Sequence, residues 1–172
     1  MDPLDESLGD MVADLRRRAM KHRSARDDYQ EKAAILADKR DRLQKKARSL
    51  SSQAQVCRQQ RDDFNISARE SKLQRDQWNA KAASMRERGG LGDIQGAREQ
   101  AENLHRNVVK MSSAGQAAHE KMCALLDEAA KLRDEAQVCH EQSLACRRAG
   151  NAEHEEYIRL VRRISELEDN PY

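Results

Sequence analysis

Apolar side chains in this chain recur in a heptad pattern that predicts two long helices. In the first half, larger residues occupy every seventh position from Leu8 to Met85, and a line of mostly small residues runs from Val12 to Ala82. In the second half, the small line (a) runs from Ala101 to Ile164 and the large line (d) from Leu104 to Leu167. Heptads kept in phase over this length are typical of a coiled coil. The two lines together form the predicted seam.

A glycine-rich segment separates the two patterns. Three of the residues at 89–92 are glycine, which ends a helix and permits a turn, and Asp93 can cap the helix that follows. The two prolines, at positions 3 and 171, leave the interior free for helix. We predict a flexible N-terminus at 1–5, helix at 6–88, a turn at 89–92, helix at 93–168 and a tail at 169–172. The fold class is all-α, a long two-helix antiparallel coiled-coil hairpin that can also dimerise.

Composition and charge support this fold. Only 3% of the residues are aromatic and 36% are charged, which excludes an ordinary globular core. Residues 1–90 carry a net charge of +6, whereas residues 91–172 carry −4. A basic arm and an acidic arm attract each other, so the charge pattern favours pairing of the two helices.

Two repeats with the same spacing lie on this seam. A pattern R-D-x-Φ-[NQ], where Φ is a large apolar residue, occurs four times in the first helix at intervals of 14, 21 and 14, and four histidines of the second helix follow the same intervals. Folding about the glycine turn predicts four register pairs. They are Asn79 with His105, Asn65 with His119, Gln44 with His140, and Gln30 with His154. The same register places Leu36 on Gly150 and Leu43 on Ser143.

Candidate chemistry is sparse. Successive histidines lie two or three heptads apart, roughly 20–30 Å, so no two can share a metal ion, and we interpret them as polar register residues. No phosphate-cradling loop, nucleophile elbow or paired acids occur, so we expect no catalytic residue, no metal, no cofactor and no enzyme activity. The four cysteines form no CxxC pair and are expected to be small reduced core residues. Without an apolar run of about 20 residues or a signal peptide, the expected location is cytoplasmic, with no membrane contact.

Basic stretches in the first helix raise a second hypothesis. A row of cations along a helix can follow a polyphosphate backbone, although a solvated face that attracts the acidic helix explains the same charges. The candidate nucleic-acid-binding residues are Lys39, Arg42, Lys45, Lys46, Arg48, Arg86 and Arg88. Four further arginines, Arg26, Arg40, Arg61 and Arg75, fall on the seam itself. We expect them to lay their methylenes on the seam and extend the guanidinium to water or a carboxylate.

The repeats resemble a known family. The R-D-x-Φ-[NQ] segments, Ala118-His119-Glu120, and the run from Ala152 to Tyr157 look like uncharacterised archaeal coiled-coil proteins, over roughly residues 25–168. These are grouped with a fungal nuclear-segregation coiled-coil protein associated with messenger RNA and polysomes. Longer members carry extra sequence between the arms, where this chain has only residues 89–92. Some members carry a phosphatase label, but the DxDx[TV] nucleophile motif is absent here.

These observations together predict a non-catalytic coiled-coil interaction or adaptor protein. The resemblance implies association with RNA or the ribosome, and a protein partner or a homodimer is the other expected form of contact. The alternative is a structural or oligomeric scaffold without nucleic acid, and a more remote alternative is an enzyme such as a phosphatase.

Overall fold

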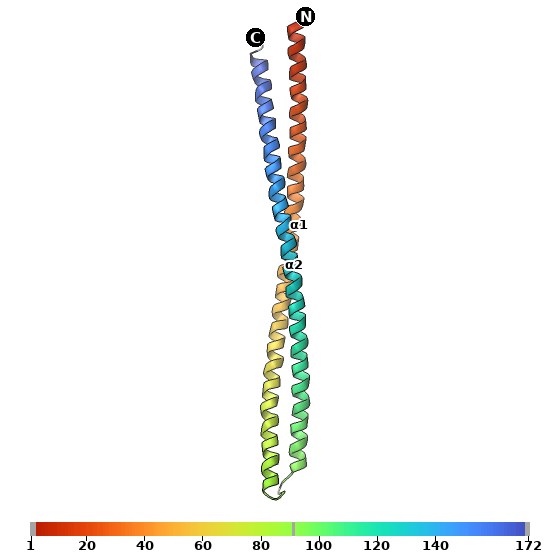
Figure 1. The fold of residues 1–172 in the computed structure, drawn as a ribbon, viewed down its shortest axis with the longest axis vertical. Coiled ribbons are helices and arrows are strands. Elements are labelled where there is room, and N and C mark those ends of the chain that lie inside the picture. Colours follow the sequence, from red (N-terminus) through yellow and green to blue (C-terminus); the bar gives the residue numbers. More distant parts are fainter. Residues whose placement is uncertain (1–2, 91, 171–172) are drawn as a thin grey trace. The chain divides into compact units, whose positions relative to one another are not determined.

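The computed structural model describes residues 3–90 and 92–170, which form two helices, α1 (Pro3–Glu87) and α2 (Ile94–Asp169), joined as an all-α hairpin (Figure 1). Helix α1 begins three residues earlier than predicted and ends one residue earlier, and α2 begins and ends one residue later. Proline is tolerated in the first turn of a helix, so Pro3 does not prevent the early start. Residues 1 and 2 of the predicted N-terminus, Leu91 of the turn, and residues 171 and 172 of the tail lie outside the described residues. Neither helix contains a stretch apolar enough to span a membrane, within the residues described.

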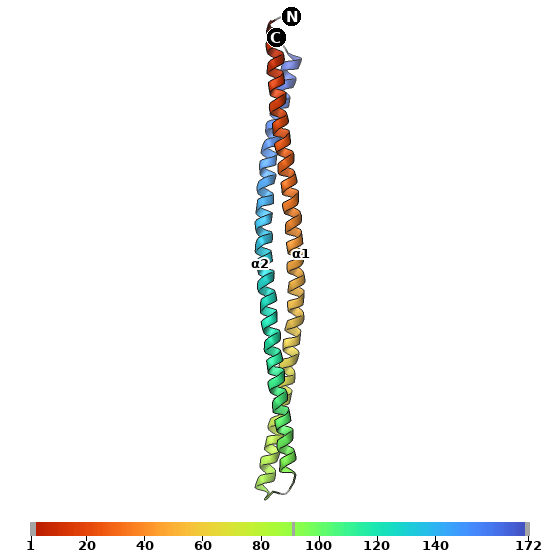
Figure 2. The ribbon, with the colours of Figure 1, turned by 90° about the vertical axis from the view of Figure 1, so that its right-hand side faces the viewer.

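The hairpin divides into two compact units. The terminal unit comprises Met1–Lys45 and Leu132–Tyr172, and the turn unit comprises Lys46–Lys131. Within each unit a segment of α1 lies beside a segment of α2 and runs in the opposite direction, as both views show (Figures 1 and 2).

The buried residues confirm the predicted seam. Every buried apolar residue falls on the a or d heptad line of its helix, and the two buried polar residues, Ser71 and Ser143, fall there too. The core of the turn unit consists of Ala47, Leu50, Ala54, Cys57, Ala68, Ala82, Ala97, Ala101 and Ala129. The terminal unit buries Val12, Ala19, Ala33, Ala136, Cys139, Leu160 and Ile164. Because most of these side chains are alanine, the core is narrow and the helices are held by many small contacts.

The turn is built by its glycines, as predicted. Gly89, Gly90 and Gly92 have φ angles of 79°, 81° and 118°, a region that side chains with a Cβ rarely adopt. Helix α1 ends in a Schellman motif, in which the Gly90 amide donates to the Met85 carbonyl at 3.1 Å and the Gly89 amide donates to the Arg86 carbonyl at 3.2 Å. Asp93 caps α2 by accepting a hydrogen bond from the Gly96 amide at 2.8 Å.

The register differs from the prediction by one heptad. A Cβ built on Gly115 would lie 3.6 Å from the Phe64 Cβ, and one built on Gly150 would lie 3.3 Å from the Tyr29 Cβ. Gly150 therefore faces Tyr29 and not Leu36. Ser143 donates to the carbonyl oxygen of Ala33 at 2.9 Å, so its predicted placement against Leu43 is also wrong. The physical reason is size, because a glycine opposite Phe64 and opposite Tyr29 leaves room for these bulky side chains.

The two seam glycines should respond differently to alanine. A Cβ at Gly115 meets the Asn65 Oδ1 at 2.7 Å, but that atom ends a flexible side chain and can move. A Cβ at Gly150 meets the Tyr29 Cβ at 3.3 Å and the Arg26 carbonyl oxygen at 3.6 Å, which are fixed to the backbone. Alanine gains about 1 kcal/mol of helix propensity at both sites. We expect Gly115→Ala to melt higher than Gly150→Ala, and the opposite order in thermal unfolding would contradict this packing.

Candidate functional site: four arginine–histidine modules

Each predicted register histidine contacts an arginine of α1. The arginine Nη1 donates to the histidine Nδ1 in the pairs Arg26–His154 at 3.0 Å, Arg40–His140 at 3.0 Å, Arg61–His119 at 3.4 Å and Arg75–His105 at 3.0 Å. The first two pairs belong to the terminal unit and the last two to the turn unit. We refer to each pair, with the aspartate that follows the arginine, as an Arg–His module.

The aspartate holds the other side of each guanidinium. In the module of Arg61, Nε and Nη2 donate to the Asp62 Oδ1 at 2.9 and 2.8 Å, and the same two nitrogens bind Asp27, Asp41 and Asp76 in the other modules. The arginine side chains are only 18–25% exposed, as expected for stems that lie along the seam. The expectation that these guanidinium groups reach a carboxylate is confirmed.

The arginine contact determines the histidine tautomer. A guanidinium has only donors, so the Nδ1 atom must accept and the neutral imidazole carries its proton on Nε2. In one module this Nε2 faces a thiol, with 3.6 Å between the His119 Nε2 and the Cys123 Sγ. The residue four positions after the histidine is aliphatic in the other three modules. Those residues are Val109, Leu144 and Ile158.

The predicted pairing of amides with histidines is therefore corrected. The amide of each repeat lies one helical turn from the arginine, and Asn65 and Gln30 lie against the glycines Gly115 and Gly150 of α2. Asn65 is the clearest case, because its Oδ1 lies 2.7 Å from the Cβ position of Gly115. The amide still shares a surface depression with its module. Arg61, Asn65 and His119 line one depression of about 420 Å³, and Arg75, Asn79 and His105 line another of about 320 Å³.

The structure also contains polar contacts between the helices that the sequence analysis did not predict. His22 pairs with Glu153, and Arg16 pairs with Glu168. The amide of Asn107 donates to the Ser71 Oγ at 2.6 Å. The signal for His22, Ser71 and Glu153 was present in the sequence, because each is a polar residue on an otherwise apolar d line. A polar side chain on the seam needs a partner from the opposite helix.

The predicted nucleic-acid-binding residues are all exposed. Lys39, Arg42 and Lys45 belong to the terminal unit, whereas Lys46 and Arg48 belong to the turn unit. Within the terminal unit, these three cations are spaced three residues apart, so successive ones are neighbours on the surface of α1, and Arg42 is paired with Asp38 at 3.3 Å. Arg86 and Arg88 are exposed beside the turn.

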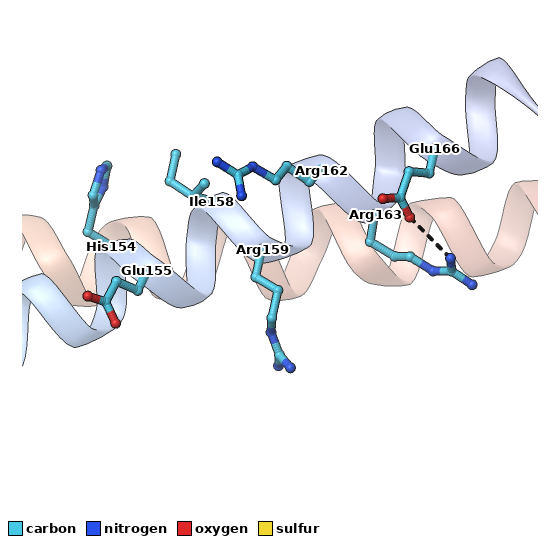
Figure 3. A pocket seen from close by; sticks show the side chains of 7 residues that line it. All are labelled: His154, Glu155, Ile158, Arg159, Arg162, Arg163 and Glu166. Atoms are coloured by element: carbon cyan, nitrogen blue, oxygen red, sulfur yellow. Dashed lines mark hydrogen bonds and ion pairs between the residues drawn. The ribbon is translucent and has the colours of Figure 1, made fainter.

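A depression of about 500 Å³ on the outer side of α2 provides no catalytic arrangement. Its lining comes entirely from residues 154–166 of α2. His154, Ile158 and Arg162 point to one side of the helix, whereas Glu155 and Arg159 point to the other (Figure 3). Arg163 is paired with Glu166 at 3.3 Å (Figure 3). Charges of both signs that pair along one helix are typical of a solvated helical surface.

A double-mutant cycle should distinguish the Arg61–His119 contact from the Asn65–His119 pair that the sequence predicted. Removing Arg61 and His119 together should cost less than the sum of the single alanine variants, with a coupling of about 1 kcal/mol. The matched cycle of Asn65→Ala with His119→Ala should be additive. Both cycles are measured by denaturant unfolding. Coupling between Asn65 and His119, with none between Arg61 and His119, would contradict the Arg–His module and support the predicted amide–histidine pair.

Comparisons with known proteins add one match. A family described as being of unknown function (DUF7121) matches residues 88–170, which include the whole turn and all of α2. No curated protein and no solved structure matches the chain. In the residues described, no group of three or more histidine, cysteine, aspartate or glutamate side chains is arranged to hold a metal ion. The matched segment contains all four module histidines.

Proposed function

We propose that the chain is a non-catalytic coiled-coil interaction protein whose surface cations bind RNA, either free or within the ribosome. The observation that carries this proposal is the repeated Arg–His module. Polar groups on a seam cost stability relative to leucine, but they restrict the helices to one alignment. Because four such modules fix the alignment of the helices, they also fix the spacing of the exposed charges. A fixed spacing suits a partner that itself carries regularly spaced charges.

RNA is favoured as the partner because the exposed charges are unevenly distributed. Residues 1–90 carry six excess positive charges, although many acidic residues of the chain lie on the outer side of α2. Cations on an extended surface attract a phosphate backbone and release its counterions. The second candidate is a structural or oligomeric coiled-coil scaffold without nucleic acid, which the attraction between the basic and the acidic helix favours.

The proposal is tested by measuring binding of the full chain to an unstructured RNA while the salt concentration is raised from roughly 50 to 200 mM. We expect binding at low salt and a linear fall of log affinity with log salt. Replacement of Lys39, Lys45, Lys46 and Arg48 by glutamine should weaken binding a few-fold, because four exposed cations are lost. A wild-type chain that binds neither RNA nor ribosomes at low salt would refute an RNA role and favour the protein scaffold.

A further inference from the structure

One edge of the turn unit carries cations without any acid among them. The e positions, one residue after each d position, flank the seam on the side where the module histidines lie. On α1 these residues are Ser51, Arg58, Asn65, Lys72, Asn79 and Arg86, and on α2 they are Arg98, His105, Ser112, His119 and Leu126. We define Arg58, Lys72, Arg86 and Arg98 as the basic edge. All four are exposed, and none forms an ion pair within the described residues.

Three surface depressions follow the same edge. Arg58 and Arg61 line the first, of about 240 Å³, and the two module depressions of about 420 and 320 Å³ follow toward the turn. The module depressions repeat one set of groups, an arginine, an asparagine and a histidine. Their arginines are 14 residues apart, which is about 21 Å along a helix. The edge therefore offers similar polar sites at a regular interval.

The groups at these sites match phosphate oxygens. Arginine, lysine and asparagine present N–H donors, and the module tautomer leaves His105 with its Nε2–H available at an exposed position. The nearest acids are Asp62 and Asp76, which already hold the module guanidinium groups, and Glu102, which lines the last depression and is paired with Arg106. No aromatic residue occupies an e position of this unit, so stacking on bases has no platform here.

The other surfaces of the unit differ. The charged residues at the outer f positions are mainly acidic, with Glu87, Glu99, Glu120 and Asp127 against Arg106, and the other f positions are uncharged. The opposite edge, at the g positions, carries Lys46, Lys81, Arg88 and Lys121, but Glu128 interrupts it, and none of its lysines lines any of these three depressions. The g edge thus provides a control with a similar number of cations.

We propose that the basic edge of the turn unit binds the sugar–phosphate backbone of single-stranded RNA, without base preference. The proposal rests on the RNA-binding function proposed above and assigns that function to one surface. Phosphates contact the basic edge and the donors of the three depressions, while the acidic outer positions keep the strand away from the back of α2.

Two matched variants test the assignment. The edge variant carries Arg58→Gln, Lys72→Gln and Arg98→Gln, and the control variant carries Lys46→Gln, Lys81→Gln and Lys121→Gln. Both lose three cations, and glutamine keeps the helix propensity. Affinity for a uridine-rich RNA of about 20 nucleotides is measured by fluorescence anisotropy over a salt series, because single-stranded binding sites cover roughly 4–16 nucleotides per module. Circular dichroism melts confirm that both variants fold.

The edge variant should lose affinity about tenfold or more, and its salt slope should fall by about 2, since each phosphate contact on a single strand contributes about 0.7. The control variant should change less than about threefold. Equal losses in the two variants would overturn the assignment to this edge but leave RNA binding standing. Competition by poly-aspartate as effective as competition by RNA at equal charge would overturn it in favour of an acidic protein partner. If the wild-type chain binds no RNA, the proposed function fails, and the assignment fails with it.

Discussion

Phe64→Ala is expected to destabilise the hairpin by about 2 kcal/mol, less than the about 3–5 kcal/mol of a fully buried phenylalanine, because its side chain is only half-buried on the seam. Phe64 lies on the d line and packs against Gly115, where no side chain can move in to fill the space. The seam around it is mostly alanine, so a single large residue supplies a large share of the local apolar contact. Urea unfolding followed by circular dichroism measures the loss.

Ile66→Ala is the matched control for this experiment. Ile66 lies two residues away on the same helix, but its side chain is 51% exposed on the outer f position. Its removal should change stability by no more than about 0.5 kcal/mol. Equal losses for Phe64→Ala and Ile66→Ala would mean that the seam does not run through position 64.

Replacing one whole module by leucine is expected to stabilise the protein. The double variant Arg61→Leu with His119→Leu should be more stable than wild type by about 1–4 kcal/mol, as found when buried polar pairs give way to apolar side chains. The reason is that the Arg61 side chain is only 23% exposed, and burying a charged side chain costs free energy that burying leucine does not. Arg61→Ala alone should be destabilising, because it leaves the His119 Nδ1 without its donor.

Thermal and denaturant unfolding measure both variants. Arg58→Leu is the control, since Arg58 is exposed beside the same module and its replacement should change stability by about 0.5 kcal/mol or less. A leucine double variant that is less stable than wild type would show that the module contributes net stability and not only alignment.

The heptad pattern was sufficient to predict the seam and the turn. The a and d lines contain every buried residue, because a repeat held over many heptads allows only one face of each helix to be covered. Gly89 and Gly90 were assigned to the turn because a reversal needs positive φ, and Asp93 was identified as the cap from its position alone. These features depend on local chemistry and on periodicity.

The partners across the seam could not be deduced from spacing. The arginines, the Φ residues and the amides of α1 all repeat at 14, 21 and 14 residues, so the histidines match each of them equally well. Size accounts for the observed choice, because the bulky Phe64 and Tyr29 lie against Gly115 and Gly150. Arg61 binds Asp62 and His119 at the same time. This double contact could not be predicted because it depends on how the two helices pack against each other.

The register of the hairpin, which places each Arg–His module, is tested most directly by disulfide trapping. In a chain whose four cysteines are replaced by alanine, Ala68→Cys is combined with Met111→Cys or with Ala118→Cys. The observed register sets position 68 against 111, and the register one heptad away sets it against 118. A disulfide needs Cα atoms within about 7 Å, whereas a heptad slip moves the partner by about 10 Å. Thiol counting by mass spectrometry after mild oxidation should show rapid closure of 68 with 111 and little closure of 68 with 118. Preferential closure of 68 with 118 would contradict the register and the Arg–His modules with it.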